Sequence, residues 1–367
     1  MRAIFLSLGI ILATAIAIPA ATAQSADAPQ IENARLEKRA LAGPLAAEVK
    51  AWAASAEQPQ WLGYAVQQMG RERAMCCGDY DGSWRNGCGR CRLEERGSGT
   101  SMTSKEEGGT TKLEAPRSIA VLFRANHKQV TKIRVVSMDC SLDAGGLPFV
   151  WLSGVKPAES VALLETFVQG SDIDAHDDDY VSHGALTAIA LHADPAADRA
   201  LESFTHSGEP ESLRKQTAFW LGAAREKAGL AVLEKMAKSD PSPEVRAQVT
   251  FALSVSHEQV AVEEMIRMAH DDTSSHVRGQ ALFWLAHKAG QKAVGAITGA
   301  IEHDPDTDVK KKAVFALSQL PKDEGVPKLI EVAQTNHNRE VRKQAMFWLG
   351  QSHDPRALAF FEKILTQ

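Results

Sequence analysis

The sequence predicts a mainly α fold, in which an α-solenoid of helical hairpins with a 32-residue period follows a small β-rich, cysteine-containing domain. Two observations carry this prediction. A phenylalanine recurs at a constant step of 32 residues from position 219 to position 347, and all five cysteines lie earlier, in a stretch of alternating and β-branched residues. A fixed period of this length indicates stacked repeats, and stacked repeats present long shared faces for recognition.

Several positions keep the same 32-residue register. The recurrent residues are Phe219, Phe251, Phe283, Phe315 and Phe347. The residues that follow them alternate in size and are Trp220, Ala252, Trp284, Ala316 and Trp348. The bases that stand five residues before each phenylalanine are Arg214, Arg246, Arg278, Lys310 and Arg342.

Each repeat contains two helices. Val245, Val249 and Leu253 form one apolar stripe at helical spacing, and a second stripe begins at Val262 after a polar break. Aspartate-proline pairs suit the first turn of a helix and stand at 240–241, 304–305 and 354–355. The recurrent phenylalanine is expected to lie in the packed interface between neighbouring hairpins, since one hairpin cannot bury its apolar face alone.

The pattern Asp-Pro-x-x-x-Val-Arg-x-x-Ala/Val-x-Phe-x-Leu, present in residues 240–253 and 304–317 and less completely in 337–349, resembles HEAT repeats. The likeness is to the short bacterial kind, also found in phycobilisome lyases and in exported HEAT-repeat proteins. It covers residues 210–367, and residues 180–208 fit as a degenerate first repeat, which gives about six hairpins. The resemblance implies an α-solenoid that binds protein and names no partner.

The first 23 residues read as a secretory signal peptide. Arg2 precedes an apolar run over residues 4–18, and Ala21-Thr22-Ala23 matches a cleavage site. The run is too short to span a bilayer, and no later segment is apolar enough to do so. We therefore expect a periplasmic or secreted protein, with an uncleaved anchor as the alternative. A net charge of −5 argues against a nucleic-acid partner.

The chain before the array divides into two parts. Residues 24–56 are predicted to be a helical N-terminal segment, which Pro44 divides into two short helices. Residues 57–155 are predicted to be the β-rich cysteine domain, and the HEAT-like solenoid fills residues 157–367. The predicted strands cover residues 61–66, 118–124, 129–137 and 149–152, with a hairpin through Asn126, His127 and Lys128.

The cysteines favour disulfides, because an exported domain is oxidised. The candidates are Cys76, Cys77, Cys88, Cys91 and Cys140. Adjacent cysteines rarely bridge each other, so the simplest arrangement joins the first two to Cys88 and Cys91 and leaves Cys140 unpaired. A pairing with Cys140 would instead tie the loop to the hairpin and leave one of the other four free. A zinc knuckle is an alternative because Cys88-x2-Cys91 has ligand spacing, but the adjacent pair does not. A redox-active Cys-x-x-Cys lacks the strand-to-helix context that lowers a thiol pKa.

The remaining polar motifs predict no metal, no cofactor and no catalytic set. The acidic run at residues 172–179, followed by His183, departs from the calcium-loop pattern and suits the start of a helix instead. His257-Glu258 is a single pair, whereas the di-iron site of the similar deoxyhypusine hydroxylases needs four. Nucleophile-elbow, dinucleotide, Walker and zincin motifs are absent. The chain is therefore not expected to be an enzyme.

The leading functional hypothesis is an exported scaffold that binds a protein or peptide. The 32-residue register places a mixed row in solvent on the second helices, formed by Lys235, Arg267, Gly299, Glu331 and Lys363. The alternative binding row is Trp220, Trp284 and Trp348. The ladder of bases is expected to be structural, paired with Asp240, Asp272, Asp304 or Asp308. A thiol–disulfide or metal-dependent activity of the cysteine domain is the competing hypothesis, and the oligomeric state is left open.

Overall fold

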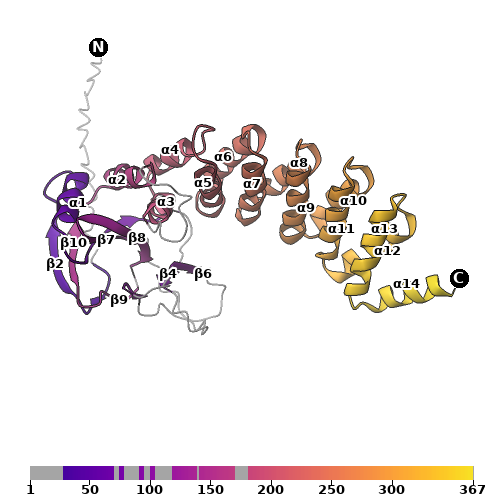
Figure 1. The fold of residues 1–367 in the computed structure, drawn as a ribbon, viewed down its shortest axis with the longest axis horizontal. Helices are drawn as coiled ribbons and strands as arrows, with labels where there is room; N and C mark the ends of the chain where they lie inside the picture. Colours follow the sequence, from indigo (N-terminus) through magenta and orange to yellow (C-terminus); the bar gives the residue numbers. More distant parts are fainter. Residues whose placement is uncertain are drawn as a thin grey trace, which may run out of the picture.

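A sheet region at one end of the computed structural model passes into a line of paired helices that ends at α14 (Figure 1). The structure describes residues 28–69, 91–94, 118–138, 140–169 and 181–366, with the backbone alone for residues 74–77 and 100–103. The predicted fold class, a helical array behind a β-rich region, is confirmed. The predicted signal peptide, Cys88 and the acidic run at 172–179 lie outside the described residues.

The main sheet has five strands in the order β2-β10-β3-β7-β8. Strand β10 runs parallel to both β2 and β3, and the other neighbours are antiparallel. His127 and Lys128 have φ values of 50° and 64°, as the tight turn between β7 and β8 requires. The strands are β2 (Arg35–Ala40), β10 (Pro148–Ser153), β3 (Gln60–Gln67), β7 (Ser118–Asn126) and β8 (Gln129–Ser137).

Two smaller sheets lie beside the main one. Strands β1 (Ile31–Glu32), β9 (Leu142–Asp143) and β5 (Cys91–Arg92) form the first. Strands β4 (Ala74–Cys77) and β6 (Thr100–Thr103) form the second. The four strands predicted from alternating and β-branched residues all correspond to strands of the main sheet.

The prediction of a helical segment over residues 24–56 is wrong for its first part. Strands β1 and β2 occupy residues 31–40, and only α1 (Leu45–Ala54), which begins directly after Pro44, is helical. Strand β2 is an edge strand with mostly exposed, charged side chains, which is how sheets protect an edge from further pairing. The sequence prediction missed this strand because its residues are mostly charged. Its pairing with β10 depends on tertiary structure.

The main sheet is buried on both faces. Alternate residues of β3, namely Leu62, Tyr64 and Val66, face a core shared with the helices. Trp61 faces a second core on the opposite side, which also contains Cys91 and Cys140. The cysteines described by the structure therefore lie on the side of the sheet that faces away from the helical array.

The array begins with α2 (Pro157–Gln169) and continues as six helical hairpins along residues 181–366. Its first helices pack on one another from repeat to repeat. These first helices are α3 (Ser182–Leu191), α5 (Glu211–Ala224), α7 (Pro243–Val255), α9 (Ser275–Ala289), α11 (Thr307–Ser318) and α13 (Arg339–Gln351). The second helices are α4 (Pro195–Ser203), α6 (Glu226–Ser239), α8 (Val260–Asp271), α10 (Gln291–His303), α12 (Lys322–Thr335) and α14 (Pro355–Leu365).

Two of the three predicted aspartate-proline helix starts are displaced by two residues. Helix α7 is capped by Ser242 and α11 by Asp306, whose side chains accept backbone N–H groups of the first turn. Only Asp354 caps its helix as predicted, accepting the N–H of Arg356. Asp240 and Asp304 lie two residues before the caps because they bind the arginines described below.

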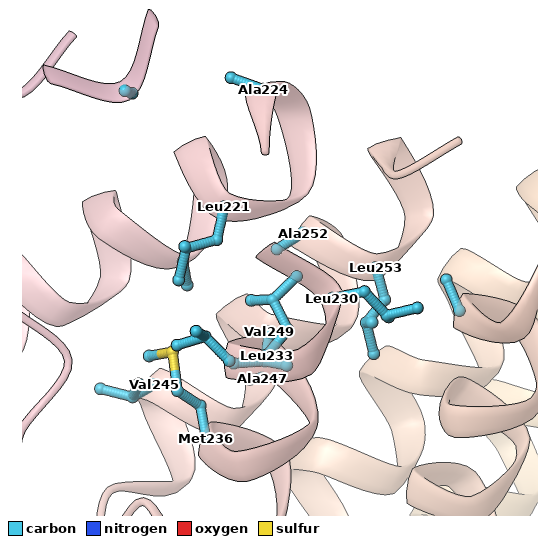
Figure 2. Packing of buried hydrophobic residues seen from close by; sticks show 14 of the residues in the cluster. Leu221, Ala224, Leu230, Leu233, Met236, Val245, Ala247, Val249, Ala252 and Leu253 are labelled. Atoms are coloured by element: carbon cyan, nitrogen blue, oxygen red, sulfur yellow. The ribbon is translucent and has the colours of Figure 1, made fainter. Parts of the chain in front are cut away.

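Aliphatic side chains fill the space between repeats (Figure 2). Leu221, Val249 and Leu253 are buried almost completely where α5, α6 and α7 meet. The backbones of α5 and α7 come so close at Gly222 that a Cβ atom there would lie 2.1 Å from the carbonyl oxygen of Ala252. A hydrogen atom is the only side chain that fits at this crossing.

The array is joined to the sheet by a shared core and a polar network. Helix α3 meets β8 at Gly184, where a Cβ atom would lie 2.1 Å from the carbonyl oxygen of Ile133. The Tyr64 hydroxyl donates to Ser160 Oγ over 2.7 Å, and Ser160 donates to His192 Nε2 over 2.8 Å. His192 Nδ1 donates to the Ala188 carbonyl over 2.6 Å, so a neutral imidazole satisfies every partner.

The glycine contacts yield a matched pair of substitutions. Gly222→Ala is expected to destabilise the protein by roughly 1–3 kcal/mol, because the new methyl group overlaps the Ala252 carbonyl. Gly299→Ala is expected to stabilise it by about 0.5–1 kcal/mol, since this helical glycine has no atom within 4 Å of the added Cβ. Urea unfolding of both variants measures the difference, and equal shifts would contradict the close approach of α5 and α7.

His192 gives the protein a defined pH dependence. Burial lowers the pKa of His192 to about 4, whereas an unfolded histidine titrates near 6.5. Between these values the unfolded chain binds more protons, so lowering the pH from 6.5 towards 4 should reduce stability by roughly 1.4 kcal/mol per pH unit from this group. The slope contributed by His192 vanishes above and below that window. Thermal unfolding of the His192→Gln variant should lack this component, and an unchanged slope would refute it.

Candidate functional site

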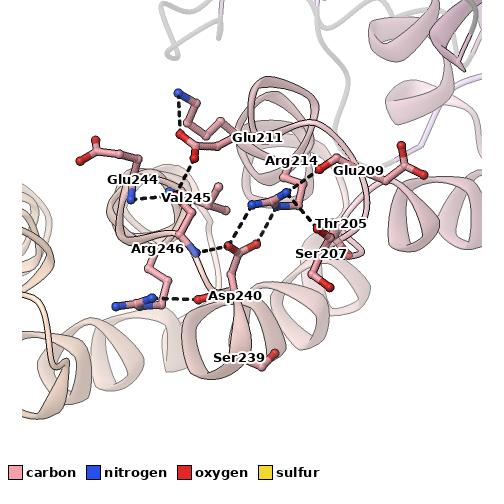
Figure 3. Close-up of polar contacts among 12 residues, drawn as sticks. Thr205, Ser207, Glu209, Glu211, Arg214, Ser239, Asp240, Glu244, Val245 and Arg246 are labelled. Atoms are coloured by element: carbon pink, nitrogen blue, oxygen red, sulfur yellow. Dashed lines mark hydrogen bonds and ion pairs between the residues drawn. The ribbon is translucent and has the colours of Figure 1, made fainter.

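Buried ion pairs link three successive repeats, those that begin with α5, α7 and α9, to the start of the next. Arg214 Nε lies 2.9 Å from Asp240 Oδ2, and both side chains are almost fully buried (Figure 3). Arg246 pairs with Asp272 at 2.8 Å in the same geometry, and Arg278 with Asp304 at 2.8 Å. Each carboxylate also accepts the backbone N–H two residues later, which fixes the chain between the helices.

The same arginines also bind backward along the array. Arg246 Nη1 donates to the Asp240 carbonyl over 2.8 Å, and Arg278 Nη1 donates to the Asp272 carbonyl over 2.9 Å. Carboxylate pairing raises the pKa of the Arg246 guanidinium, so the charge persists at all ordinary pH values. The structural interpretation of these bases is confirmed for Arg214, Arg246 and Arg278. Asp308 is not one of their partners, because it pairs with Lys311 in solvent.

The recurrent phenylalanines are not core residues. The first four are half-buried, and Phe347 is 54% exposed. The expectation that they fill the interface between repeats is therefore wrong. That space is occupied by aliphatic residues of the stripe, such as Leu253 and Val249, while the phenylalanines lie at the margin of the helical face.

These rings form one continuous row, which we call the aromatic ladder. It runs across five successive first helices, and each ring contacts the next. Its residues in spatial order are Trp220, Phe219, Phe251, Trp284, Phe283, Phe315, Trp348 and Phe347. The successive centroid separations are 5.1, 5.9, 4.7, 4.8, 5.9, 4.8 and 5.0 Å.

The alternation of tryptophan and alanine follows from the ladder. Phe219 stacks on Phe251 with an interplanar angle of 12° in the repeat that contains Ala252. In the next repeat Trp284 reaches back and meets the ring of Phe251 instead. The pattern then repeats, with Phe283 stacked on Phe315 and Trp348 against Phe315. Ala252 and Ala316 are fully buried. Repeats with the small alanine are joined to the preceding repeat by stacked phenylalanines, and the repeats with Trp284 and Trp348 are joined to it by a contact between tryptophan and phenylalanine.

A row of amides accompanies the ladder. One glutamine precedes the phenylalanine by three residues in four of the five repeats, on the same face of the helix. Within the described part of the chain, these four side chains make no hydrogen bond, and all are half-buried. The residues are Gln216, Gln248, Gln280 and Gln344. The 32-residue register contained this row, although the sequence prediction did not use it.

The predicted row on the second helices is already engaged in ion pairs. Lys235 on α6 binds Glu202 at 2.6 Å, and Glu331 on α12 binds Lys328 at 2.9 Å. Arg267 on α8 was expected in solvent, but its side chain is only 33% exposed and pairs with the buried Glu264. Lys363 on α14 is exposed. The structure does not join these residues into one patch.

The cysteine region can be described only in part. Cys91 and Cys140 are fully buried beneath the sheet, and each is disulfide-bonded. The side chains of Cys76 and Cys77 lie outside the described residues, so the pairing stays a prediction. Among the side chains that the structure places, no group of three or more histidine, cysteine or acidic residues could hold a metal ion. No helix in the same part is long and apolar enough to cross a membrane.

Comparison with known proteins identifies the array. A family model of HEAT repeats matches residues 198–286, 262–347 and 294–367. The array is thus made of HEAT repeats, as its sequence pattern suggested. A search of curated proteins finds no match to this chain.

Three solved structures match part of this chain at low sequence identity. The Escherichia coli protein YibA has 22% identity over 58% of this chain and 82% of its own, with a TM-score of 0.36. Human deoxyhypusine hydroxylase has 20% identity over 57% and 85%, with a TM-score of 0.25. The CpcE–CpcF phycocyanin lyase complex from Nostoc has 19% identity over 54% and 77%, with a TM-score of 0.28.

The buried ion pairs can be tested by removing one partner. Asp240→Ala is expected to cost roughly 3–5 kcal/mol, because it leaves the Arg214 guanidinium buried and unpaired. Asp308→Ala removes the solvent-exposed pair with Lys311 and should cost at most about 1 kcal/mol. Denaturant unfolding of the two variants gives the comparison, and similar losses would show that the buried pair does not hold the repeats together.

Proposed function

We propose that this chain, whose residues 198–367 are HEAT repeats, is an exported scaffold that binds a protein or peptide partner through its array. The observation that carries the proposal is the aromatic ladder. The signal-like sequence of residues 1–23 supports the export part of the proposal, with the protein in the periplasm or outside the cell.

Half-exposed aromatic rings are strong anchors for a protein partner. Aromatic residues dominate the energetics of protein interfaces because they bury a large area with few rotatable bonds. In the ladder every ring is already held by a neighbour, as Phe251 is between Phe219 and Trp284. Binding therefore costs little additional side-chain entropy.

The amide row supplies the polar half of such a surface. A bound polypeptide presents main-chain N–H and C=O groups, and a glutamine amide can pair with either. The four amides lie one helical turn from the rings, so a chain that crosses the five repeats meets a ring in each of them and an amide in four. Ladder and amides are uncharged, so we expect binding to depend only weakly on salt.

The second-helix row is the weaker candidate for the binding face. Lys235, Arg267 and Glu331 are each neutralised by a partner of opposite charge. A ligand would have to replace those pairs, which lowers the net gain. The cysteine region favours a bracing role over thiol chemistry, because Cys91 and Cys140 are buried and bonded.

The two faces can be separated by a capture experiment with the native envelope fraction. The bound protein would be identified by mass spectrometry, purified and titrated by calorimetry. Phe347→Ala and Gln280→Ala should each weaken binding roughly 5- to 30-fold, as loss of an interface anchor does. Lys235→Ala serves as the matched surface control and should leave affinity within about twofold. Loss of binding in Lys235→Ala alone would move the site to the second helices.

A further inference from the structure

The carbonyl groups at the ends of certain first helices bind a cation from the next repeat. The last carbonyls of a helix have no partner within it and carry its negative dipole end. Lys288 Nζ donates to the carbonyls of Ser254 and Ser256 over 2.8 and 2.5 Å. The side chain of Lys288 therefore closes the end of α7.

An earlier pair of repeats uses an arginine in the same way. Arg225 Nη1 donates to the carbonyls of Ala190 and His192 over 3.3 and 2.6 Å. These two carbonyls stand 64 residues before those of Ser254 and Ser256, which is the period of the tryptophan-alanine alternation. The carbonyl pair therefore recurs in register, whereas the cation that binds it does not, since Arg225 lies 63 rather than 64 residues before Lys288.

The third pair of carbonyls has no such cation. Advancing a further 64 residues places the carbonyls at Ser318 and Leu320 and replaces Lys288 with Ser352. The Ser352 hydroxyl donates to Leu349 in its own helix over 2.7 Å. Among the residues described by the structure, nothing donates to the carbonyls of Ser318 and Leu320.

A cavity of about 170 Å³ lies where the lysine would be. It lies between α11, α12 and α13 and is lined by Ser318, Leu320, Val326, Leu329, Trp348 and Ser352, among others. Trp348 stands in register with Trp284, four residues before the serine as Trp284 is before Lys288. A cavity of about 150 Å³ holds a benzene molecule, so this one admits a butylammonium chain.

We propose that this cavity is a binding site for a primary ammonium group on an aliphatic stem, supplied by a lysine side chain of the bound partner. The two carbonyls accept from the ammonium, and the helix end favours its charge. Val326 and Leu329 suit the methylene groups, and the Trp348 indole adds a π face. The inference that a partner's lysine supplies the ammonium group rests on the proposed function. The inference that the cavity binds an ammonium group does not.

The charged residues near the cavity do not alter this assignment. Lys322 is part of the lining, and Glu324, beside the lining residue Gly325, has a buried carboxylate oxygen without a hydrogen-bond donor. Their opposite charges offset each other. Lys288 shows that the carbonyl pair holds an ammonium without any carboxylate among its hydrogen-bond partners.

The test is a titration of the full chain with Nα-acetyl-lysine methylamide, followed by the indole N–H signal of Trp348 in NMR spectra. Ser352→Lys should fill the cavity with the chain's own ammonium, raise the melting temperature and weaken binding of the probe at least tenfold. Gln334→Lys, the matched control, adds the same charge at an exposed position of α12 outside the cavity lining and should leave binding within twofold. Unchanged binding in Ser352→Lys would overturn the assignment.

Two further experiments test whether the site requires a positive charge and whether it exists independently of the scaffold function. The Nε-acetylated probe has no positive charge and should not bind, so equal binding of both forms would refute an ammonium site. Lys288→Ser should open the equivalent position beside Trp284 and add a second site for the charged probe. These outcomes do not depend on a protein partner, so absence of captured protein would refute the scaffold while leaving the ammonium site standing.

Discussion

Each hairpin of the array has an apolar face that only the adjacent hairpin can cover, and this nearest-neighbour burial determines the remaining geometry. Aliphatic burial alone would allow neighbours to slide. The arginine-aspartate pairs prevent this, because a buried charge displaced from its partner is costly. Arg246 binds Asp272 ahead and the Asp240 carbonyl behind, so the position of one repeat is fixed relative to both of its neighbours.

A constant step of 32 residues places equivalent residues of successive repeats in rows along the array. Because the 32-residue step is constant, rings too far apart in sequence to meet otherwise come within contact distance in the ladder. Two alternating ring contacts then double the period to 64 residues. The carbonyl pairs have the same doubled period, and Lys288 and Ser352 are equivalent positions in it.

The sequence predicted the features that follow from a regular spacing of residues. It did not predict the features that depend on contacts between distant segments. The hairpins, the main strands and the structural role of the arginines were readable from spacing. Strand β2 was missed, because an edge strand with exposed charges resembles a helix in composition. The half-exposure of Phe283 was missed because it shares the phase of the core stripe, and only the packing shows that aliphatic residues fill the interface. The 32-residue register shows that Ser352 stands where Lys288 stands two repeats earlier. Only the structure shows that the lysine at this position binds a pair of carbonyl groups.

The sheet region closes the end of the array that carries no ladder. Helix α3 lies against β8 at Gly184, and the chain just after β3 pairs with the end of α3, where the Met69 N–H donates to the Leu191 carbonyl over 2.8 Å. One apolar core runs through both regions without a break. A terminal repeat needs such a cover to stay soluble. The described cysteines, Cys91 and Cys140, lie in the second apolar core, on the face of the sheet away from the array.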